Sequence, residues 1–239
     1  MRKGKQYSLT ILLYVVVITV FGLITSVANR AVTVVSEAIP VERSCCIIID
    51  PGHGGEDGGA VSVSGLPESS YNLDISFRLN DLFCLMGYHT KMLRTTDCSI
   101  YTQGNSIAEK KVSDLKERVR IVNSTENGIL ISIHQNNFPD SRYSGAQIFY
   151  GKQDHSKDFA LMLQESFTQT LNKGSNRKIK SADGVYLMQH VECPAVLVEC
   201  GFLSNIQEEA LLRSPDYQKK LCCVIVTATL DFLDRNALG

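Results

Sequence analysis

Two histidines and two glutamates stand where the apolar runs of this chain stop or where a helical pattern begins. His134 directly follows the run ILISI, and His53 comes shortly after the run CIIID. Glu199 directly follows AVLV, whereas Glu68 opens a helical pattern. Two histidines and one carboxylate form a zinc site with a fourth position left open for water. A second carboxylate near such a site is suited to act as a general base.

Each of these residues also has a simpler interpretation when it is taken alone. A histidine at a strand end is most often a satisfied polar residue, and Glu68 suits a helix N-terminus, whose dipole favours an acidic side chain. Glu199 is harder to explain in this way, because carboxylates are rarely buried without a partner. The spacing contains no short metal motif of the His-Glu-x-x-His kind, so spacing alone leaves the metal site open.

The glycines around His53 give its loop an unusual backbone. Gly54, Gly55, Gly58 and Gly59 carry no side chains, so a ligand or a metal ion can approach the backbone closely there. The chain of 239 residues has a formal net charge of -1 and no block of like charge. This composition lacks the basic footprint of a nucleic-acid-binding protein, so we expect no nucleic acid partner.

The N-terminus predicts export. Arg2, Lys3 and Lys5 precede an uncharged run over residues 9–28, which as a helix would reach about 30 Å, the thickness of a hydrocarbon core. This length favours an uncleaved anchor helix within residues 1–28, although residues 26–28 (SVA) resemble a signal-peptide cleavage site. Both alternatives place the later residues outside the cytoplasm, either membrane-anchored or secreted, because the positive charges stay inside.

Strand and helix patterns alternate after a short linker over residues 29–44. Strands are predicted over 46–50, 88–94, 129–133, 146–150, 185–188 and 195–199. Helices are predicted over 70–86, 113–123, 156–172 and 215–235, with a further helix opened by the capping-box pattern Asn205-x-x-Glu208. The alternation predicts a single α/β domain over 45–239, with a largely parallel, roughly six-stranded twisted sheet flanked by helices. Sites in such sheets gather at the carboxyl ends of the strands.

Four ordered motifs resemble those of a known enzyme family. They are IDPGHGG at 49–55, Glu68 ahead of Asn72-Leu73, SIHxN at 132–136 and VExGFLSN at 198–205. Together they resemble the zinc-dependent N-acetylmuramoyl-L-alanine amidases of the amidase-3 family, over nearly all of residues 45–235. KVSDLKxRV at 111–119, SGAQ at 144–147 and GVYLMQ at 184–189 are similar to its germination-specific, spore-cortex (CwlD-type) members.

The resemblance implies a role for each candidate residue. His53, Glu68 and His134 match the ligands of one zinc ion, Glu199 matches the catalytic glutamate, and Asn136 is expected to orient the substrate or a ligand. The implied reaction is hydrolysis of the amide between the lactyl group of N-acetylmuramic acid and the L-alanine of the peptidoglycan stem peptide. In spores this step precedes muramic-δ-lactam formation in the cortex, which germination requires.

The resemblance also implies a location and partners. We expect peptidoglycan as substrate, membrane association through the N-terminus, and action on the forespore or cortex side in a spore-forming bacterium. Some clostridial relatives require a lipoprotein, so a lipoprotein activator is a further candidate partner. Two alternatives stay open, a peptidoglycan-binding pseudoenzyme and another zinc peptidoglycan hydrolase. Gly54 and Gly55 are expected to leave an open floor for the glycan–peptide junction at the zinc.

Overall fold

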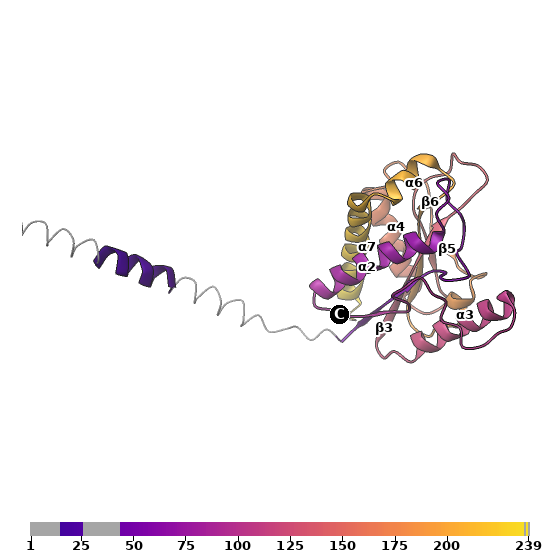
Figure 1. Cartoon of the computed structure of the whole chain (residues 1–239), viewed down its shortest axis with the longest axis horizontal. Coiled ribbons are helices and arrows are strands. Elements are labelled where there is room, and N and C mark those ends of the chain that lie inside the picture. The colour runs from indigo at the N-terminus through magenta and orange to yellow at the C-terminus, as the bar shows by residue number, and fades with distance from the viewer. Residues whose placement is uncertain (1–14, 26–43, 237, 239) are drawn as a thin grey trace, which may run out of the picture. The chain divides into compact units, whose positions relative to one another are not determined.

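The computed structural model describes residues 15–25, 44–236 and 238 of the chain (Figure 1). It divides into two units, residues 1–41 and 42–239. Of the first unit, residues 15–25 are described and form an exposed helix. Among the described residues, no helix is both long enough and apolar enough to cross a membrane. Most of the predicted anchor over 1–28 and of the linker over 29–44 lies outside the described residues.

The second unit is built on one six-stranded sheet, which confirms the predicted fold class. Its strands have the order β2-β1-β3-β6-β4-β5. β1, β2, β3 and β6 run parallel, while β4 is antiparallel to β6 and parallel to β5. The bounds are β1 (Cys46–Pro51), β2 (His89–Met92), β3 (Gly128–Asn136), β4 (Gln147–Tyr150), β5 (Lys180–Ser181) and β6 (Ala195–Phe202).

Helices cover both faces of this sheet (Figure 1). Ile47 and Ile49 of β1 pack into the larger core with α2, α4 and α7, whereas Ile48 packs into a smaller core with α3 and α5. Successive strand side chains point to opposite faces, so a strand covered on both sides is apolar throughout. The helices are α2 (Glu68–Leu85), α3 (Ile107–Asn123), α4 (Ser156–Gln169), α5 (Tyr186–His190), α6 (Ile206–Leu212) and α7 (Pro215–Arg235).

The prediction of a strand over 185–188 is wrong, because Val185 caps the short helix α5 and the following residues belong to that helix. Leu187, Met188 and Val191 are all buried, at a spacing that a helix places on one side. A short apolar run does not distinguish a buried strand from a buried helix. The sixth strand is instead the two-residue β5.

Polar side chains at the N-cap positions explain where helices α3 and α6 begin. α3 begins six residues before its predicted start, because Ser106 and Glu109 form a reciprocal capping box there. At α6 only half of the predicted box is present. The Asn205 side chain accepts hydrogen bonds from Gln207 N and Glu208 N, while the Glu208 carboxylate accepts from backbone N–H groups elsewhere.

A buried arginine of α3 lies under the carboxyl end of β1. The Arg118 guanidinium forms an ion pair with Asp50, donates to the carbonyls of Pro51 at 3.0 Å and His53 at 2.8 Å, and pairs with Asp114 at 2.7 Å. Burial alone would raise the pKa of Asp50, but Arg118 and the Ser132 hydroxyl outweigh it and hold this pKa below its usual value. The charged pair thus fixes the chain where β1 becomes the histidine loop.

A second buried arginine holds the same turn from the β2 side. Arg94 donates from Nε to Pro51 O at 2.9 Å, and from Nη2 to Gly52 O at 3.0 Å and Ser69 O at 2.9 Å. Three consecutive carbonyls, those of residues 51–53, therefore accept hydrogen bonds from guanidinium groups. The contact to Ser69 also ties this turn to the first turn of α2.

Replacing Arg118 by Met is expected to lower the free energy of unfolding by about 3–5 kcal/mol, because Asp50 is left buried and charged without its partner. Urea unfolding followed by circular dichroism measures the loss. Arg120→Met is the matched control, since Arg120 lies on the same helix in an exposed pair with Glu117. An equal effect of the two variants would contradict the role given to Arg118.

Candidate metal centre

Three residues from separate elements converge at the carboxyl edge of the sheet. His53 lies in the loop after β1, Glu68 is the first residue of α2, and His134 lies on β3. Glu68 Oε2 is 3.3 Å from His53 Nε2, and Glu68 Oε1 is 2.9 Å from His134 Nδ1. One ligand atom from each residue lies within 4.8 Å of the other two, a spacing that a metal ion can occupy.

The backbone and side chain of His53 are both held in place. Its φ of 59° is in the left-handed region, which residues other than glycine rarely adopt. Asp57 Oδ2 lies 3.0 Å from His53 Nδ1 and 3.0 Å from Lys111 Nζ. Burial alone would lower the pKa of His53, but Glu68 and Asp57 raise it on balance. A carboxylate on the outer nitrogen is the usual support of a metal-binding histidine, and it leaves Nε2 facing Glu68.

Glu68 is buried among hydrogen-bond donors. Its Oε1 accepts from Gln135 N at 3.1 Å and from Asn72 Nδ2 at 3.2 Å, and its Oε2 accepts from Ala60 N at 3.1 Å. Burial alone would raise the pKa of Glu68, but His134 and then the other imidazole lower it well below its usual range. The carboxylate is therefore ionised and oriented, as a metal ligand must be.

Two glycines make room for these ligands. A Cβ on Gly52 would lie 2.2 Å from His134 Nε2, and a Cβ on Gly59 would lie 2.6 Å from Glu68 Oε2. Both contacts are far shorter than van der Waals distance, so the two positions exclude any side chain. The glycine requirement thus comes from the packing of the three-residue cluster itself.

The expectation that Gly54 and Gly55 leave an open floor at the metal is wrong. A Cβ on Gly54 would lie 2.4 Å from Cys98 O, and a Cβ on Gly55 would lie 2.8 Å from Ser99 N. Both glycines have positive φ and pack against the segment that follows β2. They allow the loop to turn closely beside a neighbouring backbone, away from the ligand cluster.

Glu199 of β6 is adjacent to His134 in the sheet register. Its Oε2 is buried and has no hydrogen-bond partner among the described residues. Burial raises the pKa of Glu199 to about 7, with a further increase from Glu68 and an opposing effect of the two imidazoles. A carboxyl group of this pKa can take up and release a proton near neutral pH.

A cavity of about 210 Å³ opens beside these residues. His53, His134 and Glu199 line it together with Arg118, and Leu115, Val185 and Leu187 add apolar walls from α3 and the α5 region. Two imidazoles and an ionised carboxylate are the donor set of catalytic zinc sites, and Glu199 lines the same cavity as the two histidines. The residues present therefore fit one zinc ion.

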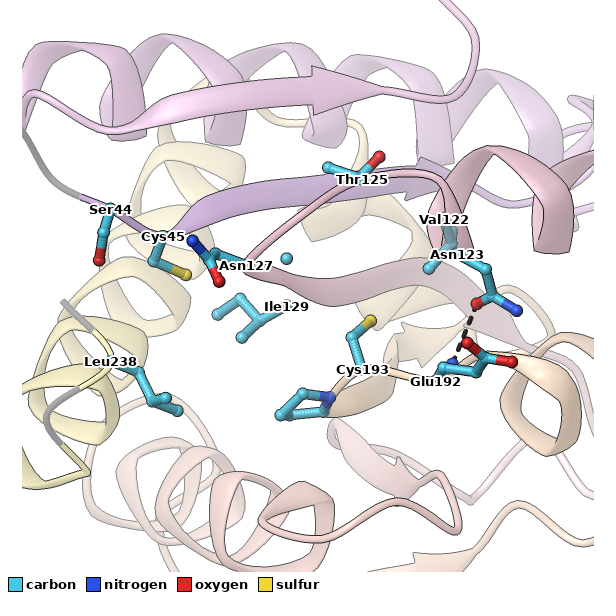
Figure 2. A pocket seen from close by; sticks show the side chains of 12 residues that line it. Ser44, Cys45, Val122, Asn123, Thr125, Asn127, Ile129, Glu192, Cys193 and Leu238 are labelled. Carbon is cyan, nitrogen blue, oxygen red and sulfur yellow. Dashed lines mark hydrogen bonds between the residues drawn. The ribbon is translucent and has the colours of Figure 1, made fainter.

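A larger cavity, of about 460 Å³, lies at the opposite edge of the sheet (Figure 2). Cys45, Ile129 and Cys193 line it near the amino ends of β1, β3 and β6, and Asn123 accepts a hydrogen bond from Glu192 N there at 3.0 Å. It contains none of the four candidate residues. The side chains that line it, rather than its volume, therefore make the smaller cavity the candidate active site.

Comparison with known proteins agrees with this geometry. The family model described as N-acetylmuramoyl-L-alanine amidase matches residues 47–230. This chain belongs to that family. The germination-specific N-acetylmuramoyl-L-alanine amidase of Bacillus subtilis (strain 168) is 39% identical to it over 188 residues, 78% of either chain.

Solved structures extend the comparison to the fold of this amidase. The CwlD amidase from Clostridioides difficile, solved in complex with the GerS lipoprotein, is 36% identical, with a TM-score of 0.75 over 79% of this chain and 98% of that one. An N-acetylmuramoyl-L-alanine amidase from Clostridium difficile 630 is 28% identical, with a TM-score of 0.68 over 80% and 98%.

The structure of the amidase brings together His53, Glu68, His134 and Glu199 as the sequence predicts, but Asn136 lies further along β3. Its backbone carbonyl accepts from Leu203 N at 2.8 Å, and it does not line the cavity of the site. A role for Asn136 in orienting the substrate therefore stays a prediction.

Sequence reasoning missed the supporting residues of the amidase site, chiefly Asp57, Asn72, Arg94 and Arg118. Asp57 follows His53 by four residues in a polar loop, where an acidic residue is unremarkable. The two arginines come from segments 41 and 65 residues further along the chain than His53, and only the fold brings them to its loop. Asn72 and Arg118 do stand in the motifs quoted from the sequence, but those motifs gave them no supporting role.

Replacing Asn72 by Ala is expected to weaken zinc binding about 10–100-fold, because Asn72 Nδ2 holds both Glu68 Oε1 and the carbonyl of Gly52. Competition with a chromophoric chelator measures the affinity, and thermal melts of the metal-free proteins report folding. Asn80→Ala, on the same helix but hydrogen-bonded to Thr90 and Asp81, should bind zinc as the wild type does. Wild-type affinity in Asn72→Ala would refute this role.

Proposed function

We propose that this amidase uses one zinc ion, held by His53, Glu68 and His134, to hydrolyse the amide between the lactyl group of N-acetylmuramic acid and the L-alanine of the stem peptide. The observation that carries the proposal is Glu199 Oε2, buried and unpartnered beside that cluster. A buried carboxylate oxygen without a partner is destabilising, so it persists where function needs it free.

The bound zinc ion would supply a Lewis acid that polarises the scissile carbonyl and acidifies a water molecule. Glu199 accepts a proton from the attacking water through its free oxygen and later donates it to the departing alanine nitrogen. A pKa of about 7 suits both transfers. Asp57 holds the His53 ring, and Asn72 holds the Glu68 carboxylate, so that neither ligand has to reorganise.

Two alternatives from the sequence are less well supported. A peptidoglycan-binding pseudoenzyme needs neither an ionised Glu68 between two imidazoles nor an unpartnered Glu199, and this chain retains both. A zinc hydrolase that cuts within the stem peptide would use the same donor set, so the products must decide. Mass spectrometry of digested peptidoglycan should show free glycan strands that carry lactyl groups, and peptides that begin with L-alanine.

In that assay Glu199→Gln is expected to bind one zinc ion per chain and to lose about 10²–10⁴-fold in turnover, because the proton acceptor is gone while the ligands remain. His134→Ala should lose both zinc and activity. Zinc content is measured by atomic absorption on the same preparations. Near-normal turnover of Glu199→Gln would overturn the assignment of Glu199, and stem peptides cut internally would overturn the amide specificity.

The organisation of the whole chain is part of the proposal. We infer that residues 1–28 export the chain, as an anchor or as a cleaved signal, and that residues 29–44 link them to a catalytic domain over 45–239. The three basic residues ahead of the uncharged run support this organisation. The protein would then act on peptidoglycan on the extracytoplasmic side. A lipoprotein activator is proposed because the Clostridioides difficile relative was solved with one.

The similarity to the germination-specific relative supports a role in maturation of the spore cortex. Deletion of the gene is expected to remove muramic-δ-lactam from cortex muropeptides and to block germination, and Glu199→Gln should not restore either. Liquid chromatography with mass spectrometry of purified cortex measures the lactam. Unchanged lactam in the deletion strain would reject the cortex role and leave the amidase chemistry standing.

A further inference from the structure

The loop between β3 and β4 carries two exposed aromatic rings beside the catalytic edge of the sheet. Phe138 and Tyr143 are 45% and 48% exposed. Their ring centroids are 4.8 Å apart, and the rings meet edge to face at 74°. Two large rings that touch each other and remain half exposed form a surface suited to bind a ligand with an apolar face.

This loop is connected to the catalytic residues at both of its ends. It leaves β3 after Asn136, two residues beyond His134. It enters β4 at Gln147, which is the register partner of Glu199. The loop therefore joins the end of the strand that carries His134 to the strand position paired with Glu199.

The rings rest on a rigid base. Tyr143 stacks on the buried Phe202 of β6, with centroids 6.2 Å apart and an interplanar angle of 28°. The guanidinium of Arg177 lies 4.6 Å from the centroid of the Phe202 ring and donates from Nη1 to Gln147 Oε1 at 2.9 Å. The aromatic stack is thus tied to the strand position next to Glu199.

The backbone of the loop is fixed as well. Phe138 N donates to Ser204 Oγ at 3.1 Å, and Asn205 Nδ2 donates to Tyr143 O at 3.3 Å. Arg177 Nε donates to Ser144 O at 2.8 Å. Rings that are already ordered lose little conformational entropy when a ligand binds, so a weak stacking contact becomes useful affinity.

We propose that Phe138 and Tyr143 form a carbohydrate platform, on which a sugar ring of the glycan strand stacks next to the muramic acid whose amide is cut. The inference rests on the proposed function, which requires a substrate that carries a glycan at the scissile amide. The apolar C–H face of a pyranose ring matches an exposed aromatic face. The charged pair of Arg142 and Asp140, which lies between Phe138 and Tyr143 in the sequence, supplies polar partners for hydroxyl groups.

A platform of this kind contributes binding energy remote from the reacting bond. Removing it should weaken binding of long glycan strands and leave a substrate with a single muramic acid unaffected. A structural contribution of the same rings would instead reduce the activity on both substrates equally. The comparison of long and short substrates therefore separates the two roles.

Binding of purified, peptide-free glycan strands to the full chain tests the platform directly, because these strands contain no amide to cut. Tyr143→Ala and Phe138→Ala are each expected to weaken strand binding about tenfold in isothermal titration. Phe77→Ala, which removes an exposed ring from the outer surface of α2, should bind as the wild type does. Phe138→Trp should retain binding, because an aromatic face is preserved.

The kinetic arm uses the wild type and the same variants. Tyr143→Ala should raise KM for long strands with attached peptides about tenfold, with kcat and the kinetics on a single muramoyl peptide unchanged. Equal losses on both substrates, or unaltered strand binding in Tyr143→Ala, would overturn the platform. If the wild type cut no muramoyl amide but bound strands through these rings, the proposed function would fail and the platform would stand.

Discussion

The candidate metal centre depends on the ion pair and hydrogen bonds that the buried Arg118 guanidinium forms. This guanidinium lies where β1 ends, forms an ion pair with Asp50 and donates hydrogen bonds to the backbone carbonyls of Pro51 and His53. A buried polar group without a partner is strongly destabilising, so these hydrogen bonds favour the observed path of the backbone through the turn. That path holds His53 at a positive φ and directs its ring toward Glu68.

The electrostatics of the site follow from this placement. Glu68 lies between two imidazoles and stays ionised, because donors surround both of its oxygens. Glu199 pairs with His134 across neighbouring strands, its Oε2 has no donor among the residues that the structure describes, and it holds its proton to higher pH. The different partners of these two buried glutamates thus give them opposite pKa shifts, which suit the metal ligand proposed for Glu68 and the proton carrier proposed for Glu199.

Much of this arrangement was predictable from the sequence. Apolar runs that stop at His134 and Glu199 identified strands whose carboxyl ends meet, and the motifs identified Glu68. The segment 185–188 was misassigned because apolar content alone does not separate a buried helix from a buried strand. Arg94 and Arg118 were not predictable as supports of His53, because their contacts span 42 and 65 residues of sequence.

The proposed metal centre is tested most directly by a crystal structure of the zinc-loaded protein with anomalous data collected at the zinc edge. We expect one zinc peak, about 2.0–2.2 Å from a ring nitrogen of His53, a carboxylate oxygen of Glu68 and a ring nitrogen of His134. Glu199 should lie beside the open coordination position without binding the ion. A zinc ion bound elsewhere, or one that binds Glu199 in place of Glu68, would refute the proposed ligand set.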